Sequence, residues 1–96
     1  MTEWTFLTNH AHVLLCLTED RDIRLRDLAE KVNISERAVK RIVADLDHTG
    51  YISRKRFGRR NRYEIHVEQP IRSPLARTLE IGALLAIMVP FVSTTL

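Results

Sequence analysis

Residues 24–54, RLRDLAEKVNISERAVKRIVADLDHTGYISR, decide the fold because two helical patterns and the start of a strand follow one another there. Apolar residues recur on one side of a short helix predicted over 27–32, and again at i, i+3, i+4 and i+7 in a longer helix predicted over 36–48. Ser35 is a suitable N-cap for the longer helix, and Gly50 can take the left-handed conformation that often ends one. The stretch therefore predicts two helices joined by a tight turn, with a strand after them.

One further helix is predicted ahead of this stretch, over residues 9–18, where apolar residues again recur at helical spacing. Thr8 or Asn9 can cap it. Between this helix and the next, Ile23 and Leu25 alternate with a polar residue. The alternation predicts either a very short strand or an extended entry into the second helix.

A β-hairpin is predicted over residues 53–63, SRKRFGRRNRY, because the apolar period changes from 3.6 to 2 after the second motif helix. Tyr63, Ile65 and Val67 alternate with polar residues, which predicts a strand with one apolar face. Gly58 can supply the positive φ that a tight turn between two strands requires. The basic stretch is therefore expected to form the two arms and the tip of a folded hairpin.

The positive charge of the chain is concentrated in this hairpin. Residues 51–66 carry a net charge of +5, whereas residues 1–50 carry −2 and residues 67–96 are neutral. A local patch of one sign indicates a polyanionic partner more than a device for general solubility. Arginine supplies most of the patch, and its planar fork can hold a phosphate or a guanine edge through two hydrogen bonds.

The C-terminal part of the chain is strongly apolar. Pro70 and Pro74 bracket a linker, and a fourth helix is predicted over 75–89. Apolar residues cover more than half of its circumference, and a small domain cannot bury such a helix alone. We therefore predict that it pairs with a second copy to form a homodimer. The predicted dimer interface comprises Leu75, Leu79, Leu84, Leu85 and Met88.

A membrane surface or a separate protein partner is the alternative for this helix. The apolar run over 81–92 is shorter than the roughly 18 to 20 residues that span a bilayer. The helix has no Lys or Arg beyond Arg77, which disfavours binding to anionic lipid. The sequence therefore favours a second copy over a membrane.

No catalytic, metal, cofactor or small-molecule site is predicted. His12 and Cys16 stand four residues apart, as two metal ligands on one helix face can, but no second pair of ligands accompanies them. A nucleophile with a base, paired carboxylates in an apolar setting and a glycine-rich phosphate loop are likewise absent from the sequence. The single cysteine excludes an intramolecular disulfide, and no signal peptide pattern precedes the first helix, so a cytoplasmic location is predicted.

The order of elements over about residues 9–67 resembles the winged helix-turn-helix regulators of bacteria and archaea, in particular the MarR-like and ArsR-like group. The most specific features are the Leu28-Ala29 pair, Ile34-Ser35 at the turn and the exit DHTGYI over 47–52. The resemblance implies an α+β fold in which a three-helix core carries a β-hairpin wing. The apolar C-terminal helix, which is predicted above to dimerise, is added to this fold. It also implies a transcriptional regulator, not an enzyme, that binds specific sites in double-stranded DNA as a homodimer.

In this family the helix after the turn, here about residues 35–48, enters the major groove. The wing, here 53–63, lies on the DNA backbone or in the minor groove. Asn61 is expected either to fix the turn or to reach into a groove, and Phe57 either to pack or to make an exposed apolar contact. The residues that the resemblance places at the DNA are Ser35, Arg37, Ala38, Lys40, Arg41, Arg54, Lys55, Arg56, Arg59, Arg60, Asn61 and Arg62.

The chain also departs from the group that it resembles. MarR proteins carry longer dimerising helices at both ends, and metal-binding ArsR proteins carry a Cys-x-Cys motif on the first motif helix, which has no cysteine here. We assign residues 1–69 to the DNA-binding domain and residues 70–96 to the linker and the apolar helix. The alternative function is an interaction module that binds RNA or an acidic protein through the wing and docks a partner or a membrane surface through the last helix.

Overall fold

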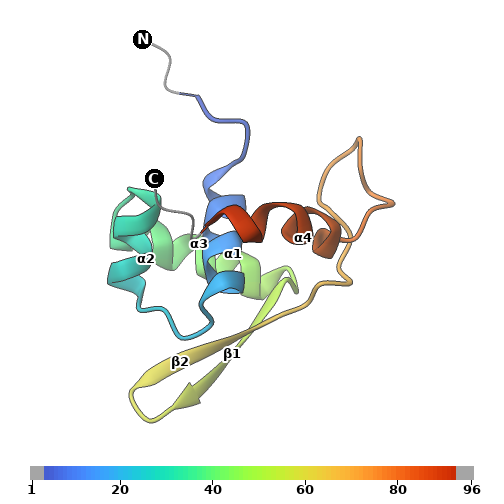
Figure 1. The fold of residues 1–96 in the computed structure, drawn as a ribbon. Helices are drawn as coiled ribbons and strands as arrows, with labels where there is room; N and C mark the ends of the chain where they lie inside the picture. The colour runs from blue at the N-terminus through green and yellow to red at the C-terminus, as the bar shows by residue number, and fades with distance from the viewer. Residues whose placement is uncertain (1–3, 93–96) are drawn as a thin grey trace.

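The computed structural model describes residues 4–92 and shows, within them, three helices, an antiparallel two-stranded hairpin and a C-terminal helix (Figure 1). This arrangement confirms the predicted α+β fold with a three-helix core and a β-hairpin wing. The hairpin projects away from the helices, and α4 packs across α1 (Figure 1). The elements are α1 (Asn9–Glu19), α2 (Leu25–Val32), α3 (Glu36–His48), β1 (Ile52–Phe57), β2 (Arg60–Ile65) and α4 (Ile81–Val92).

The turn between α2 and α3 forms where the sequence predicts it. Asn33 ends α2 with a left-handed φ of 64°, a conformation that asparagine tolerates better than most residues, and its N–H donates to the Glu30 carbonyl at 3.2 Å. The hydroxyl oxygen of Ser35 accepts a hydrogen bond from the Ala38 N–H at 3.0 Å, which confirms Ser35 as the N-cap of α3. α2 begins at Leu25, two residues before its predicted start.

The segment between α1 and α2 is an extended entry and contains no strand. Arg24 has extended dihedrals, with φ −78° and ψ 149°, and the next residue already begins α2. The Tyr63 N–H in β2 donates to the Arg21 carbonyl at 3.0 Å. This bond holds the entry to α2 against the outer edge of the wing.

The wing is a hairpin whose strands are joined by Gly58 and Arg59 alone. Of these two residues only Gly58 has a positive φ, of 62°, which is the pattern of a type II′ turn. Tyr63 and Ile65 are buried, as the alternation predicts. Val67 lies beyond the end of β2 and is exposed, so the prediction was wrong for that residue.

One apolar core joins all the helices and the root of the wing. The side chains of Leu17 and Leu28 are fully buried at its centre, where α1 meets α2 and α3. Ile52 and Ile65, which face each other across the hairpin, close the core from the wing side. The other buried members are Val13, Leu14, Leu15, Cys16, Ala29, Val39, Ile42, Val43, Leu46, Tyr51, Tyr63, Ile81 and Leu85.

The predicted start of the fourth helix was wrong, because α4 begins at Ile81 and residues 70–80 form a loop. The Ile81 N–H donates to the Gln69 carbonyl at 2.7 Å, and the Gly82 N–H donates to the Val67 carbonyl at 2.9 Å. These acceptors satisfy N–H groups that a helix leaves free at its first turn, so they fix its start. An isolated antiparallel β-bridge between Pro70 and Glu80 joins the two ends of the loop.

α4 packs into the core of the domain by one side. Ile81 and Leu85 are buried, and the rest of the helix is partly or fully exposed over its described side chains. Gly82 allows the close approach, because a Cβ at this position would lie only 3.0 Å from the Val67 carbonyl oxygen. Within residues 4–92, no helix is long and apolar enough to cross a bilayer.

Candidate nucleic-acid interface

α3 presents a basic line to solvent on the side opposite the core. Arg37, Arg41, Ala44 and His48 are exposed and recur at i, i+4, i+7 and i+11, which places them on one face of the helix. Neither arginine forms an ion pair or a side-chain hydrogen bond with any residue that the structure describes. Ala44 leaves room between the arginines and His48. The helix can therefore approach a polyanion closely along this line.

Lys40 lies on the edge of α3 that faces the wing. Asp47 follows it by two helical turns and is therefore on the same side. Both the Nε and the Nη2 of Arg54 in β1 donate to the Asp47 Oδ2, at 3.2 and 3.0 Å. This ion pair fixes the base of the wing to the last turns of α3. Lys40 itself has no partner among the residues of the described range.

The amino end of α3 carries the other two predicted contact residues. Ser35 is exposed, and its hydroxyl oxygen is engaged by the cap hydrogen bond, which leaves its O–H free to donate outward. Ala38 is half-buried on the flank of the helix. Ser35 thus lies at the amino end of α3, ahead of the basic line, and Ala38 lies on the flank of the helix.

Of the six wing cations, four form hydrogen bonds or ion pairs within residues 4–92 and two do not. The Arg56 Nε donates to the Gly58 carbonyl at 3.3 Å, and the Arg60 Nη2 donates to the Asp22 carbonyl at 3.0 Å. Arg62 lies 3.6 Å from the Asp22 carboxylate, and Arg54 is bound to α3 as described above. Lys55 and Arg59 have no partner within residues 4–92.

Like charges face each other across the wing. The strand register places Lys55 directly opposite Arg62. Such a pair destabilises a hairpin, because the Cβ atoms of directly opposite residues are only about 5 Å apart and the like charges that they carry repel each other. Asp22 offsets part of this repulsion through Arg62. A polyanion bound on this face would offset the rest.

An open groove of about 510 Å³ separates the wing from the start of α2 and α3. The wing contributes Arg59, Arg60 and Asn61 to it, and it is also lined by Arg24 at the entry to α2 and by Arg26 in the first turn of α2. The side chain of Asn61 makes no hydrogen bond within the described chain, so it is not seen fixing the turn. The groove is also lined by Asp22 and Glu36, together with Ile23, Leu25 and Tyr63.

Four residues of this surface were missed by the sequence predictions. Arg24 and Arg26 belong to the groove only because the wing folds back over the entry to α2. Nothing local in the sequence signals that contact. Ala44 and His48 share the helical spacing of the arginines, and continuing the helical pattern from Arg37 would have identified them.

Cys16 and the histidines near it have structural roles. Cys16 is buried in the core, and burial raises the pKa of its thiol, which keeps the thiol neutral. His12 contacts the Asn9 Oδ1 at 3.3 Å, and His10 contacts the Asp45 Oδ2 at 2.8 Å. Over residues 4–92, no three His, Cys, Asp or Glu side chains gather in the manner of a metal site.

The residues predicted for a dimer interface do not share one surface. Leu75 and Leu79 lie on the loop before α4 and are exposed, whereas Leu84 and Met88 are half-buried on the helix. Leu85 is a core residue, only 3% exposed, so its predicted place at an interface was wrong for the chain as folded here. The exposed apolar stripe of α4 is instead formed by Ala83, Ile87 and Phe91.

The helical part of this surface has a counterpart among known protein families. Residues 8–53 match the family model described as winged helix-turn-helix DNA-binding. The match covers α1, α2, α3 and the first two residues of β1, and it supports a DNA-binding regulator. It does not distinguish a MarR-like from an ArsR-like protein. No curated protein matches the chain.

Proposed function

We propose that this protein is a homodimeric transcriptional regulator that acts in the cytoplasm and binds specific sites in double-stranded DNA. In this proposal α3 enters the major groove, and the wing lies along the backbone and the adjacent minor groove. The observation that carries it is that Arg37 and Arg41 on the outward face of α3, and Lys55 and Arg59 on the projecting wing, have no partner among residues 4–92.

The two elements would have different tasks at the DNA. Arg37 and Arg41 can each hold the O6 and N7 of a guanine with two hydrogen bonds, which reads sequence. Lys55 and Arg59 on the wing, and Arg24 and Arg26 at the start of α2, are suited to phosphate contacts, which position the protein. Sequence choice is thus assigned to α3, and sequence-independent affinity to the wing and the groove.

Selection of bound fragments from genomic DNA at near-physiological salt tests this proposal. The expected result is a small set of fragments with a shared two-fold symmetric motif, retained against an excess of unrelated duplex. Equal displacement by heparin, RNA and any DNA, with no enriched motif, would instead favour the interaction module.

Ser35 allows its structural and its binding contribution to be separated. Ser35→Ala is expected to lower the free energy of unfolding by about 1 kcal/mol, because the cap of α3 is lost. Ser35→Asp keeps the cap, since Asp caps as well as Ser, but places a carboxylate against the DNA phosphates. Urea unfolding should therefore be unchanged in Ser35→Asp, while fluorescence anisotropy shows operator affinity at least roughly tenfold lower. Unchanged operator binding by this variant would show that Ser35 lies away from the DNA.

Dimerisation through α4 is proposed because its outward stripe is apolar and the domain leaves it uncovered. Ile87 and Phe91 are 66% and 69% exposed and lie one turn apart. A two-fold axis beside this stripe would pack each helix on its copy, as an isologous interface requires. It would also supply the two DNA-binding units that read two half-sites.

Ile87→Glu is expected to produce monomers, because it buries two unpaired carboxylates near the two-fold axis. Sedimentation velocity measures the change, and operator affinity should fall with it. Phe6→Glu is the matched control, since Phe6 is 92% exposed, ahead of α1 and outside the helix stripe. A dimer that survives Ile87→Glu would place the interface elsewhere.

A further inference from the structure

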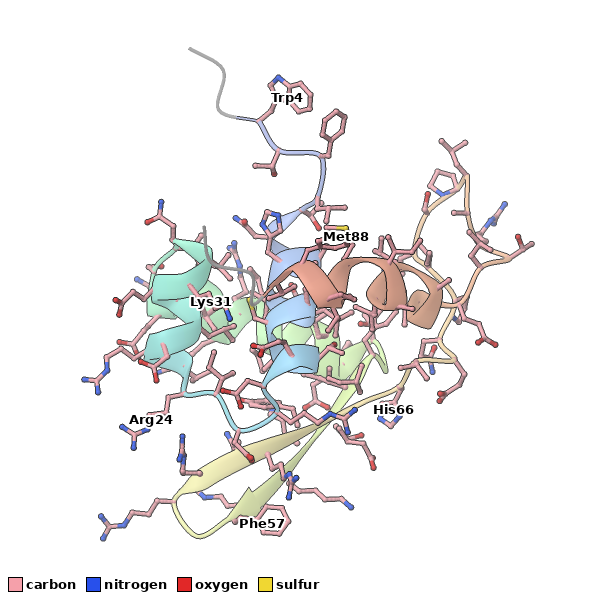
Figure 2. The ribbon with its side chains drawn as sticks, in the orientation of Figure 1. Trp4, Arg24, Lys31, Phe57, His66 and Met88 are labelled. Carbon is pink, nitrogen blue, oxygen red and sulfur yellow. The ribbon has the colours of Figure 1, made fainter. Side chains whose placement is uncertain are left out.

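Phe57 stands at the tip of the wing and has neither a core nor an aromatic partner among residues 4–92. Its side chain is 59% exposed, and it belongs neither to the core nor to the partly buried residues around it. Figure 2 shows its ring at the far end of the hairpin, away from the helices. The exposed Phe6, by contrast, has the ring of Trp4 against it at 4.9 Å. Phe57 therefore contributes little to the fold.

The ring of Phe57 lies among cations. The register places Phe57 opposite Arg60, and Lys55 opposite Arg62. Because side chains alternate along a strand, these four residues share one face of the wing. Glu64 is the one acid that lines the same hollow as Phe57, beside Arg21, Lys55 and Arg62. An exposed aromatic ring costs solubility, so a ring flanked mainly by cations favours contact with an apolar part of a polyanion. In a nucleic acid that part is the stacked bases.

The reach of the wing matches the groove spacing of a DNA duplex. A strand of six residues extends about 20 Å at roughly 3.3 Å per residue. The centres of a major groove and the next minor groove are about 17 Å apart, half of a helical turn. With α3 in the major groove, the tip of the wing thus arrives at the adjacent minor groove.

The tip is also narrow and stiff. Its loop has two residues, and nothing lies within 4 Å of the position that a Cβ on Gly58 would take. The Arg56 side chain donates back to the Gly58 carbonyl and braces the turn. A minor groove is only about 6 Å wide, so a slim, braced tip is the shape that can enter it.

We propose that Phe57 is a wedge that inserts between two base pairs from the minor groove and kinks the DNA beneath the wing. This inference rests on the proposed function and extends it. The ring unstacks one step, while Lys55 and Arg59 hold phosphates on the two sides of the groove. Flexible pyrimidine–purine steps unstack most readily, so the regulator selects TA or CA steps at a position where it makes no base-specific hydrogen bond.

The experiment uses the full chain and a duplex obtained by fragment selection. End-to-end energy transfer reports the bend, and 2-aminopurine placed under the wing reports unstacking. The wild type should shorten the end-to-end distance, raise 2-aminopurine fluorescence, and prefer a TA step to a GC step at that position by roughly tenfold. Phe57→Ser should abolish all three effects while still binding the duplex. Phe57→Leu should retain most of the bend, because leucine also serves as a wedge.

Phe6→Ala is the matched control, because it removes an exposed aromatic ring outside the wing and should bend DNA as the wild type does. A wild type that binds its duplex without bending, or a Phe57→Ser variant that bends normally, would overturn the wedge and leave DNA binding intact. If Phe57→Ser lost affinity only for single strands, the ring would be a base-stacking platform and the wedge would be wrong. A wild type without any specific duplex binding would overturn the proposed function and the wedge together.

Discussion

Replacing Arg37 and Arg41 together by alanine is expected to lower affinity for the operator by roughly 100-fold or more. Both side chains lie on the outward face of α3 and have no partner in the described part of the chain. Each bidentate contact to a guanine is worth about 1 to 3 kcal/mol, and tenfold in affinity corresponds to about 1.4 kcal/mol. Fluorescence anisotropy against the operator and a scrambled duplex, at fixed salt, measures the loss.

Whether the loss of affinity depends on DNA sequence decides whether α3 reads bases. Affinity for the scrambled duplex should change far less, because it comes from phosphate contacts. The matched variant, Lys55→Ala with Arg59→Ala, removes two wing cations that likewise have no partner within residues 4–92. It should weaken both duplexes alike and make the salt dependence shallower by about 1.8 per subunit, or about 3.6 for the proposed homodimer, from about 0.9 per phosphate contact. If the α3 variant also weakened both duplexes alike, α3 would not read bases.

Leu28→Ala is expected to lower the free energy of unfolding by about 3 kcal/mol. Leu28 is fully buried where α2 packs on α3, and truncating such a leucine leaves a cavity that a small domain fills only in part. Urea unfolding followed by circular dichroism should show a lower midpoint with an unchanged slope. Leu75→Ala, at an exposed position, should change the midpoint little. A loss below about 1 kcal/mol in Leu28→Ala would mean that the core repacks around the site.

The central motif was predictable because its determinants are local. The cap at Ser35, the apolar positions of α3 and the turn at Gly58 each depend on a few neighbouring residues, and the structure places each as expected. The basic hairpin followed from the same kind of signal, a change of period beside a glycine. Assignment of the individual contact residues to DNA stays a prediction.

The parts that the sequence misassigned depend on contacts between distant segments. α4 begins at Ile81 because carbonyls of Val67 and Gln69 accept its first N–H groups, and no local pattern encodes that docking. An apolar helix also gives no sign of which side faces its own domain, so Leu85 was assigned to a dimer interface instead of the core. Arg24 and Arg26 likewise face the wing only in the folded chain.

The hydrogen bonds from α4 to Val67 and Gln69 also bear on the spacing between half-sites that a dimer would accept. They join α4, the proposed dimer helix, to the chain as it leaves β2, and the Arg54–Asp47 ion pair joins β1 to α3. In the proposed dimer, the distance between the two α3 helices would therefore be fixed by the fold. One base pair inserted between the half-sites would turn one of them by about 35°, since 10 to 10.5 pairs make a turn. The operator should therefore tolerate base substitutions between the half-sites more readily than insertions or deletions between them.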